Sequence, residues 1–174
     1  MTLPNALTAV RAALVLPLVG LIASGDLSFA LLVFLVAAAT DAIDGPLARS
    51  RGRPTPFGAA LDPLADKILV VGVLAALALR GAAPAWAVAL IAVREIVAIE
   101  VRIRSSYAVG AAVDGKAKTV VQVAAVAALL GAGACPSPGL GAAANTLLVA
   151  AAALSVVSGV RLVLRARQTP AHTA

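Results

Sequence analysis

Four aspartates in hydrophobic sequence are the residues of this chain best suited to chemistry. They follow the pattern D-x2-D-G-x2-A-R-x8-G-x3-D-x3-D, formed by Asp41, Asp44, Asp62 and Asp66, and are half of the eight acidic residues. Ionised carboxylates at membrane depth are costly, and four together repel one another. Two divalent cations would cancel the four charges, with Mg²⁺ as the first choice and Mn²⁺ as the second. The sequence therefore predicts a two-metal site suited to phosphorus chemistry.

Helical spacing would place these carboxylates at one end of two helices. Asp41 and Asp44 are i,i+3 neighbours, and Asp62 and Asp66 are i,i+4 neighbours, so each pair shares one face of its helix. A short basic loop over 50–56 connects the two segments. We therefore expect antiparallel neighbouring helices with both carboxylate pairs at the same depth.

Three other residues of the same pattern are suited to a phosphate-bearing ligand. Gly45 and Gly58 lack side chains, which lets a phosphate or a nucleotide approach the backbone closely. Arg49 lies one turn beyond Asp44 and can meet phosphate charge that the metals leave unneutralised. The alternative is an ion-pair network without chemistry, in which Arg49 or Lys67 neutralises the aspartates.

The composition indicates an all-α integral membrane protein. The 174 residues are 61% hydrophobic, with a mean hydropathy of +1.02, which is unlike an ordinary soluble domain. Apolar runs long enough to cross a hydrocarbon core of about 30 Å recur along the chain. The six predicted transmembrane helices cover 5–23, 28–47, 57–79, 84–103, 116–133 and 142–164. We expect a single membrane domain over 1–168 and a flexible C-terminal tail over 169–174.

The positions of the positive charges predict the orientation of these helices. Six spans place both termini on one side, and the only basic residue in the opposite joins is Arg80. By the positive-inside rule, both termini face the cytosol. The net charge is +6, but its distribution indicates anionic lipid and phosphate as counterparts, not nucleic acid. The cytosolic cations are Arg49, Arg51, Arg53, Arg102, Arg104, Lys116, Lys118, Arg161, Arg165 and Arg167.

A membrane cation carrier is the alternative from another functional class. Such a protein would use the four aspartates as a pathway, with polar groups that continue across the membrane. Here the polar groups gather on one side, and the outer halves of the spans are almost wholly apolar. The pattern favours an enzyme whose active site lies at the cytosolic ends of the second and third helices.

The fixed positions from Asp41 to Asp66 match the motif of the CDP-alcohol phosphatidyltransferases, and so many positions at set spacing are a specific signal. Within this family, Leu3-Pro4-Asn5-x-x-Thr8-x-x-Arg11 resembles the bacterial phosphatidylglycerophosphate synthases. Other similar segments are Leu61-Asp62-Pro63-Leu64-Ala65-Asp66-Lys67, Arg94-Glu95 with Arg102, and Gly115-Lys116-x-Lys118-Thr119-x-x-Gln122. The resemblance covers residues 3–122.

This resemblance implies a six-helix membrane enzyme in which an alcohol hydroxyl displaces CMP from CDP-diacylglycerol. It implies that Asp41, Asp44, Asp62 and Asp66 bind two divalent metals, and that Asp66 is also the general base. The residues that would line the nucleotide site are Asn5, Thr8, Gly45, Ala48, Arg49 and Gly58. Without the resemblance, Pro4 and Asn5 would indicate a helix start with Asn5 as the N-cap.

A second group of cations predicts an anionic acceptor. Arg94, Arg102, Lys116 and Lys118 lie around the join of the fourth and fifth helices, and Glu95 is expected to hold Arg94 in place. Arg94 lies inside an apolar run, which surface solvation does not explain, whereas Lys116 and Lys118 also fit the topology rule. With the resemblance, the expected acceptor is glycerol 3-phosphate and the product is phosphatidylglycerophosphate. Two alternative acceptors stay possible: phosphatidylglycerol, which is the acceptor of a cardiolipin synthase, and inositol phosphate.

The same resemblance implies a location and an assembly. We expect a multi-pass protein of the bacterial inner (plasma) membrane whose active site faces the cytosol. The family resemblance also allows a homodimer, for which small residues of the third to sixth helices permit close packing.

Overall fold

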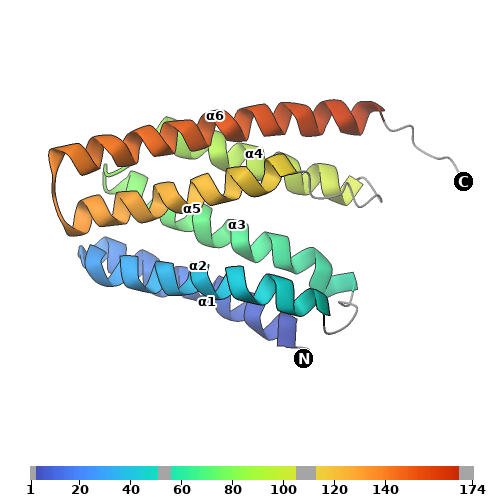
Figure 1. The fold of residues 1–174 in the computed structure, drawn as a ribbon, viewed down its shortest axis with the longest axis horizontal. Coiled ribbons are helices and arrows are strands. Elements are labelled where there is room, and N and C mark those ends of the chain that lie inside the picture. The colour runs from blue at the N-terminus through green and yellow to red at the C-terminus, as the bar shows by residue number, and fades with distance from the viewer. Residues whose placement is uncertain (1–2, 51–55, 105–112, 169–174) are drawn as a thin grey trace, which may run out of the picture.

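The computed structural model describes the backbone of residues 3–50, 56–104 and 113–168. Within these ranges, the side chains of residues 3–9, 11, 41–50, 56–66, 102–104, 113–117, 138 and 165–168 lie outside the description. The described backbone consists of six α-helices and the short turns between them (Figure 1). These helices are α1 (Leu3–Ser24), α2 (Leu27–Ser50), α3 (Pro56–Leu79), α4 (Ala85–Arg104), α5 (Val113–Ala134) and α6 (Pro138–Gln168).

The helices form an up-and-down bundle whose two ends differ (Figure 1). The N-termini of α1, α3 and α5 and the C-termini of α2, α4 and α6 lie at one end, here called the terminal end. The tight turns after α1, α3 and α5 lie at the other, here called the turn end. Each described helix agrees with a predicted apolar run to within a few residues. The prediction of six helices is therefore confirmed for the described residues, whereas the placement of both termini in the cytosol stays a prediction.

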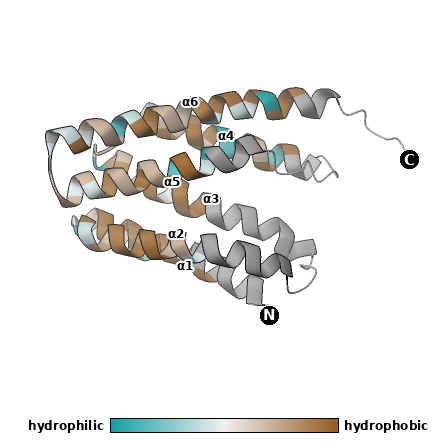
Figure 2. Cartoon of the chain, in the orientation of Figure 1, coloured by the Kyte–Doolittle hydropathy of each residue, from teal (hydrophilic) through white to brown (hydrophobic). Residues whose placement is uncertain are grey.

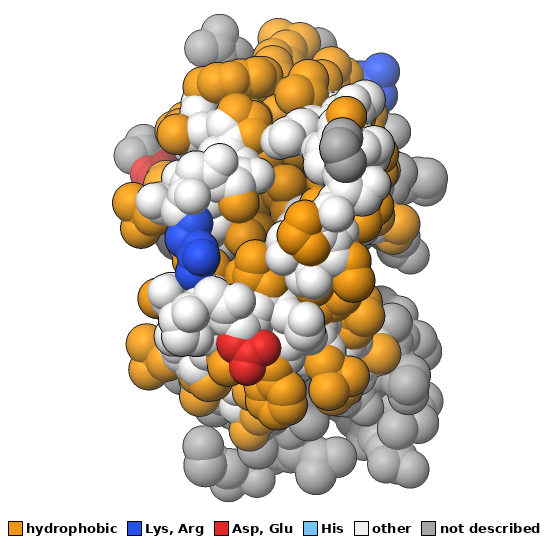
Figure 3. Space-filling view, turned by 90° about the vertical axis from the view of Figure 1, so that its left-hand side faces the viewer, with side chains coloured by type: hydrophobic (Ala, Val, Ile, Leu, Met, Phe, Trp, Pro, Cys, Tyr) orange, Lys and Arg blue, Asp and Glu red, His pale blue; other side chains and the backbone are white. Residues whose placement is uncertain are grey.

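Arg80 and Asp26 form hydrogen bonds with helix termini at the turn end. The Arg80 guanidinium, which follows α3, donates to the backbone carbonyls of Ile22 and Ala23, the latter at 3.1 Å. These carbonyls at the C-terminus of α1 have no partner within their own helix. Asp26 caps α2 by accepting a hydrogen bond from the Phe29 backbone N–H at 3.3 Å. Figure 3 faces this end and shows few charged side chains among hydrophobic and uncharged ones.

Two glycines make the turns at this end possible. Gly25 and Gly81 have positive φ angles of 91° and 72°, a conformation that side-chain-bearing residues adopt rarely. After Gly25, the backbone N–H of Asp26 donates to the carbonyl of Leu21 at 3.0 Å, which closes the end of α1. The short connections keep α1 beside α2 and α3 beside α4.

Small residues decide which helices become neighbours. A methyl group at Gly72 of α3 would lie only 2.8 Å from Cγ1 of Val15 in α1, so this glycine lets α1 and α3 touch. Gly133 of α5 admits Leu27 of α2 in the same way. Among the described residues, α2 and α3 both pack on α1 and on α5 and not directly on each other. The prediction that the acidic ends of α2 and α3 are direct neighbours concerns 41–50 and 56–66, whose side chains lie outside the described residues, so it stays a prediction.

Replacing Gly72 by alanine is expected to destabilise the bundle by about 1–3 kcal/mol through overpacking. Val15 is β-branched and stiff at χ1, so it cannot easily move away from the added methyl group. Gly20→Ala is the matched control, since nothing lies within 4 Å of a methyl group there. Thermal unfolding in detergent would measure both variants. Equal stability of the two would contradict the close packing of α1 on α3.

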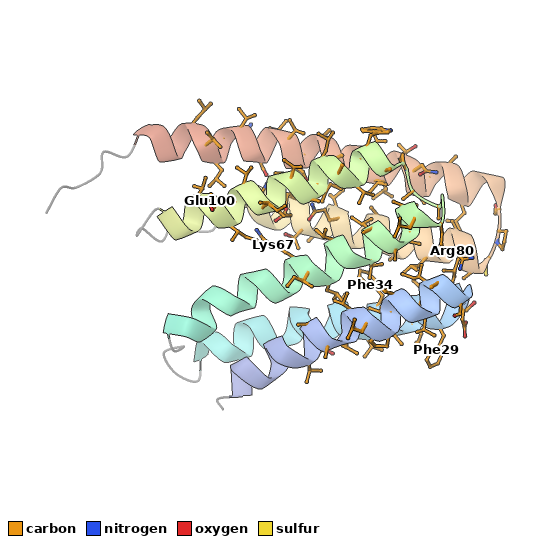
Figure 4. The ribbon with its side chains drawn as sticks, turned by 180° about the vertical axis from the view of Figure 1, so that it is seen from behind. Phe29, Phe34, Lys67, Arg80 and Glu100 are labelled. Atoms are coloured by element: carbon orange, nitrogen blue, oxygen red, sulfur yellow. The ribbon has the colours of Figure 1, made fainter. Side chains whose placement is uncertain are left out.

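The core of the bundle is mainly aliphatic, and Phe34 of α2 is the largest fully buried side chain among the described residues (Figure 4). Other fully buried members are Leu18, Ile22, Leu74, Leu77, Ile91, Leu130 and Leu148. They come from all six helices, so the described helices share one core. Burial of these apolar side chains stabilises the packing of the helices against one another. It does not account for the apolar residues on the outward faces.

The outward faces are also apolar, and Figure 2 shows that hydrophobic residues, in brown, recur along the described helices. Large hydrophobic side chains are exposed on every described helix, for example Leu16 at 78% and Val120 at 68%. In the described part of the chain, Gly139–Leu164 is long and apolar enough to cross a membrane, with a mean hydropathy of 2.3. Apolar segments of α1, α2, α3 and α5 are shorter within that part. The fold is consistent with a membrane protein; six spans stay a prediction, and the tail over 169–174 lies outside the described residues.

Candidate functional site

The terminal end of the bundle carries all four aspartates of the predicted metal site. Asp41 and Asp44 lie in the last part of α2, and Asp62 and Asp66 lie in the first half of α3. Both segments run at the terminal end (Figure 1). Their backbone is helical, as the i,i+3 and i,i+4 spacings require. The four side chains lie outside the described residues, so metal binding by them stays a prediction.

The residues predicted to bind the nucleotide belong to the same helix ends. Asn5 and Thr8 lie in the first turns of α1, and Gly58 lies in the first turn of α3. The other three, in the last turns of α2, are Gly45, Ala48 and Arg49. Their side chains also lie outside the described residues. Because α1 begins at Leu3, Asn5 lies inside the helix, and its interpretation as an N-cap is wrong.

The donor set on α2 and α3 fits hard divalent cations. Four carboxylates offer oxygen ligands, which both Mg²⁺ and Mn²⁺ accept. Two such cations would balance four negative charges that otherwise repel one another. Among the side chains that the structure describes, no group of three or more His, Cys, Asp or Glu forms another candidate.

A buried ion cluster joins α3, α4 and α5. Its centre is Glu95 of α4, which is only 4% exposed. The Nζ of Lys67 in α3 lies 2.7 Å from Glu95 Oε2, and the Nζ of Lys118 in α5 contacts Oε1. The Arg94 Nη1 donates to both oxygens, at 3.2 and 3.3 Å. Lys67 follows Asp66 directly in α3, and its side chain extends between α3 and α4 (Figure 4).

Polar side chains of α5 and α6 extend this cluster. The Arg94 Nη2 donates to Ser158 Oγ at 2.8 Å, and the Gln122 Nε2 donates to the buried Ser155 Oγ at 3.0 Å. A methyl group at Gly159 would lie 3.0 Å from Cγ of Arg94, so α6 fits closely around the arginine stem. The Arg94 Nε is buried and has no hydrogen-bond partner among the described residues.

Stability alone does not explain a cluster of this kind. Ions removed from water lose hydration, and a buried ion pair is often no more stabilising than apolar side chains of the same size. Here Lys67, Arg94 and Lys118 share the carboxylate of Glu95, and the three cations repel one another. Closely spaced ammonium and guanidinium groups are suited to bind a phosphate. Binding of an acceptor phosphate by these cations stays a prediction.

Two of the four residues predicted to bind the acceptor phosphate meet in this cluster. Arg94 and Lys118 both contact Glu95, which confirms that Glu95 holds Arg94. Lys118 is 4% exposed, so it is not a solvated surface cation. Arg102 lies in α4 and Lys116 in α5, both toward the terminal end, with side chains outside the described residues.

The structure adds residues to which the sequence assigned no site role. The sequence indicates Lys67 only as a possible partner of the aspartates, whereas the structure places its Nζ in contact with Glu95 Oε2. Ser155 and Ser158 contact Gln122 and Arg94. The sequence contains a signal that could have indicated these residues. Each is a polar side chain within an apolar run, and the two serines are spaced i,i+3, which places them on one helix face.

A groove of about 370 Å³ lies between α1 and α2. Its lining is Val10, Leu14, Leu32, Val33, Val36, Ala37 and Thr40. Leu32 and Val36 are 55% and 59% exposed, so the groove opens to the outside of the bundle. Thr40 directly precedes Asp41, so the groove leads to the acidic segment of α2. This shape suits an apolar chain whose polar end lies near Asp41.

Comparisons with known proteins agree with the motif. Residues 1–160 match the family model described as CDP-alcohol phosphatidyltransferase. A protein of Mycobacterium tuberculosis named as a probable phosphatidylglycerophosphate synthase is 37% identical over 137 residues, which are 77% of this chain and 64% of that protein. The CDP-diacylglycerol–glycerol-3-phosphate 3-phosphatidyltransferase of Bacillus subtilis is 42% identical over 102 residues, or 57% and 53% of the two chains.

A third relative carries a different name. A probable CMP-forming cardiolipin synthase of Drosophila melanogaster is 35% identical over 98 residues, which are 55% of this chain and 30% of that protein. This chain therefore spans less than two thirds of the length of each of these three relatives.

Proposed function

The chain belongs to the CDP-alcohol phosphatidyltransferase family, and from that premise we propose that it transfers a phosphatidyl group from CDP-diacylglycerol to glycerol 3-phosphate. The products are phosphatidylglycerophosphate and CMP. One observation carries the choice of an anionic acceptor: Lys67, the residue after Asp66, contacts Glu95 at 2.7 Å, and Glu95 also contacts Lys118 and Arg94. The cations around Glu95 thus include a residue of α3, the helix that carries Asp66, the candidate base.

We place the protein in the bacterial inner membrane as a single multi-pass domain over 1–168. In this proposal all six helices span the bilayer, and the terminal end faces the cytosol with both termini. The apolar outward faces of the described helices support this placement, as does the sequence distribution of Arg and Lys. A homodimer, which the resemblance allows, stays a prediction.

The acidic residues would hold the metals. Asp41 and Asp44 of α2, with Asp62 and Asp66 of α3, are the proposed ligands of two Mg²⁺ or Mn²⁺ ions. When bound, divalent cations supply charge stabilisation for the phosphoryl oxygens and for the departing CMP. The residues proposed to line the CDP part of the donor are Asn5, Thr8, Gly45, Ala48, Arg49 and Gly58.

Asp66 would act as the general base. It accepts the proton of the acceptor hydroxyl while that oxygen forms a bond to the phosphorus that bears diacylglycerol. The bond from this phosphorus to the CMP oxygen breaks, and its electron pair leaves with CMP. Arg94, Arg102, Lys116 and Lys118 would bind the acceptor phosphate and so hold the hydroxyl near Asp66.

The α1–α2 groove would receive an acyl chain of CDP-diacylglycerol. The diphosphate of this lipid must lie at the aspartates while its acyl chains stay in an apolar environment. The groove suits both requirements, because its lining is apolar apart from Thr40, and Thr40 directly precedes Asp41 in α2.

Filling this groove is expected to weaken binding of the lipid donor specifically. Val36→Trp should raise the KM for CDP-diacylglycerol by roughly tenfold, because each 1.4 kcal/mol of lost binding is tenfold in affinity. The KM for glycerol 3-phosphate should stay unchanged. Val149→Trp, at an exposed position of α6, is the matched control. Steady-state kinetics in mixed micelles would measure both, and an unchanged lipid KM in Val36→Trp would remove the groove from the donor site.

The function is tested by CMP release from the purified protein in detergent, with CDP-diacylglycerol, Mg²⁺ and one acceptor at a time. Release that requires glycerol 3-phosphate supports the proposal. Release only with phosphatidylglycerol or inositol phosphate would keep the chemistry and overturn the acceptor. No release with any alcohol, from folded protein that binds Mg²⁺, would overturn the enzyme and favour the cation carrier.

A further inference from the structure

The two carboxylate oxygens of Glu95 contact lysines from different helices. Oε2 lies 2.7 Å from Lys67 Nζ of α3, whereas Oε1 contacts Lys118 Nζ of α5. Arg94 donates to both oxygens from the same helix as Glu95. A single carboxylate therefore holds one ammonium group on each side and determines the distance between them.

The lysine on the α3 side is adjacent to the candidate base. Lys67 follows Asp66, and consecutive Cα atoms are only about 3.8 Å apart. The contact between Lys67 and Glu95 therefore connects the α3 backbone at Asp66 to the cations of α4 and α5. Moving Glu95 would change where an acceptor phosphate binds relative to the group that takes the acceptor proton.

We propose that Glu95 is a positioning residue that holds Lys67 and Lys118 as the two sides of a phosphate-binding site, and that Lys67 is an acceptor-binding cation of this site. The proposal rests on the function proposed above. It selects a short alcohol that bears a phosphate, since the phosphate must reach the lysines while its hydroxyl reaches Asp66.

Hydrogen-bonding capacity supports this assignment. Each lysine ammonium has three donors, and a guanidinium has five. Glu95 has two oxygens to share among the three cations, and the buried Arg94 Nε has no partner among the described residues. A phosphate would provide further acceptor oxygens, which the Arg94 Nε–H and the remaining donors of Lys118 could reach.

Glu95→Asp is the first test, because it keeps the charge and shortens the side chain by one methylene. It should raise the KM for glycerol 3-phosphate by on the order of tenfold to a hundredfold, as misplacement of about 1 Å can do. The KM for CDP-diacylglycerol should stay within about twofold of the wild-type value. Ser155→Ala is the matched control, because it breaks the contact with Gln122 but leaves the contacts of Glu95 intact.

A double variant separates positioning from stability. Glu95→Gln alone leaves buried cations without their carboxylate and is expected to fold poorly. Glu95→Gln with Lys67→Met removes one charge of each sign, and its thermal unfolding temperature should recover toward that of the wild type. The KM for glycerol 3-phosphate should stay raised despite this recovery.

The outcomes decide the proposal in either direction. A wild-type KM for glycerol 3-phosphate in Glu95→Asp would mean that Glu95 has only a structural role. The same would follow if the double variant regained both its thermal stability and the wild-type KM for glycerol 3-phosphate. Failure of the proposed function is distinguishable, because the wild-type protein itself would then release no CMP in response to glycerol 3-phosphate.

Discussion

Asp66→Asn is expected to lower CMP release that depends on glycerol 3-phosphate by roughly 10²–10⁴-fold, the usual contribution of a general base. Asparagine has nearly the same size as aspartate but cannot accept the hydroxyl proton, and it offers no negative charge to a metal. The rate should be measured with purified protein in detergent, at saturating CDP-diacylglycerol and Mg²⁺.

Asp26→Asn is the matched control for this substitution. Asp26 lies at the turn end and caps α2 through the Phe29 backbone N–H at 3.3 Å. Its replacement should preserve activity, since asparagine is also a good N-cap. Wild-type activity in Asp66→Asn would contradict the proposed base, whereas equal losses in both variants would indicate a general effect on folding.

Removal of divalent cations is expected to reduce the transfer reaction to background. The four carboxylates of α2 and α3 would then repel one another and the donor diphosphate, with no positive charge between them. EDTA treatment followed by titration with Mg²⁺ or Mn²⁺ would measure the loss and its recovery. We expect both ions to restore activity, because oxygen ligands accept both.

Asp41→Asn should raise the Mg²⁺ concentration that is needed for half-maximal activity, because one negative ligand is lost. Thermal unfolding with and without EDTA is the control for loss of fold. Full activity after exhaustive chelation of folded protein would contradict metal binding by the aspartates, although it would leave the phosphate-binding role of the lysines open.

The sequence alone determined the six helices and the end of the bundle that carries the aspartates. Long apolar runs separated by short polar joins leave few other folds, because backbone groups in an apolar environment must be satisfied within the helix. An up-and-down path then brings the C-terminal part of α2, which contains Asp44, to the same end as the N-terminal part of α3, which contains Asp62. The contact of Arg94 with Glu95 was also predictable, since the two are consecutive in an apolar run.

Only the tertiary structure decided which helices touch and which buried charges meet. Whether α1 packs on α3 depends on the fit of Val15 against Gly72, a contact between segments distant in the sequence. The contact of Lys67 with Glu95, and the burial of Lys118 beside it, depend on how α3, α4 and α5 pack together. Helical periodicity is a local property of the chain, whereas the partner of a buried ion is determined by the shapes of all the helices around it.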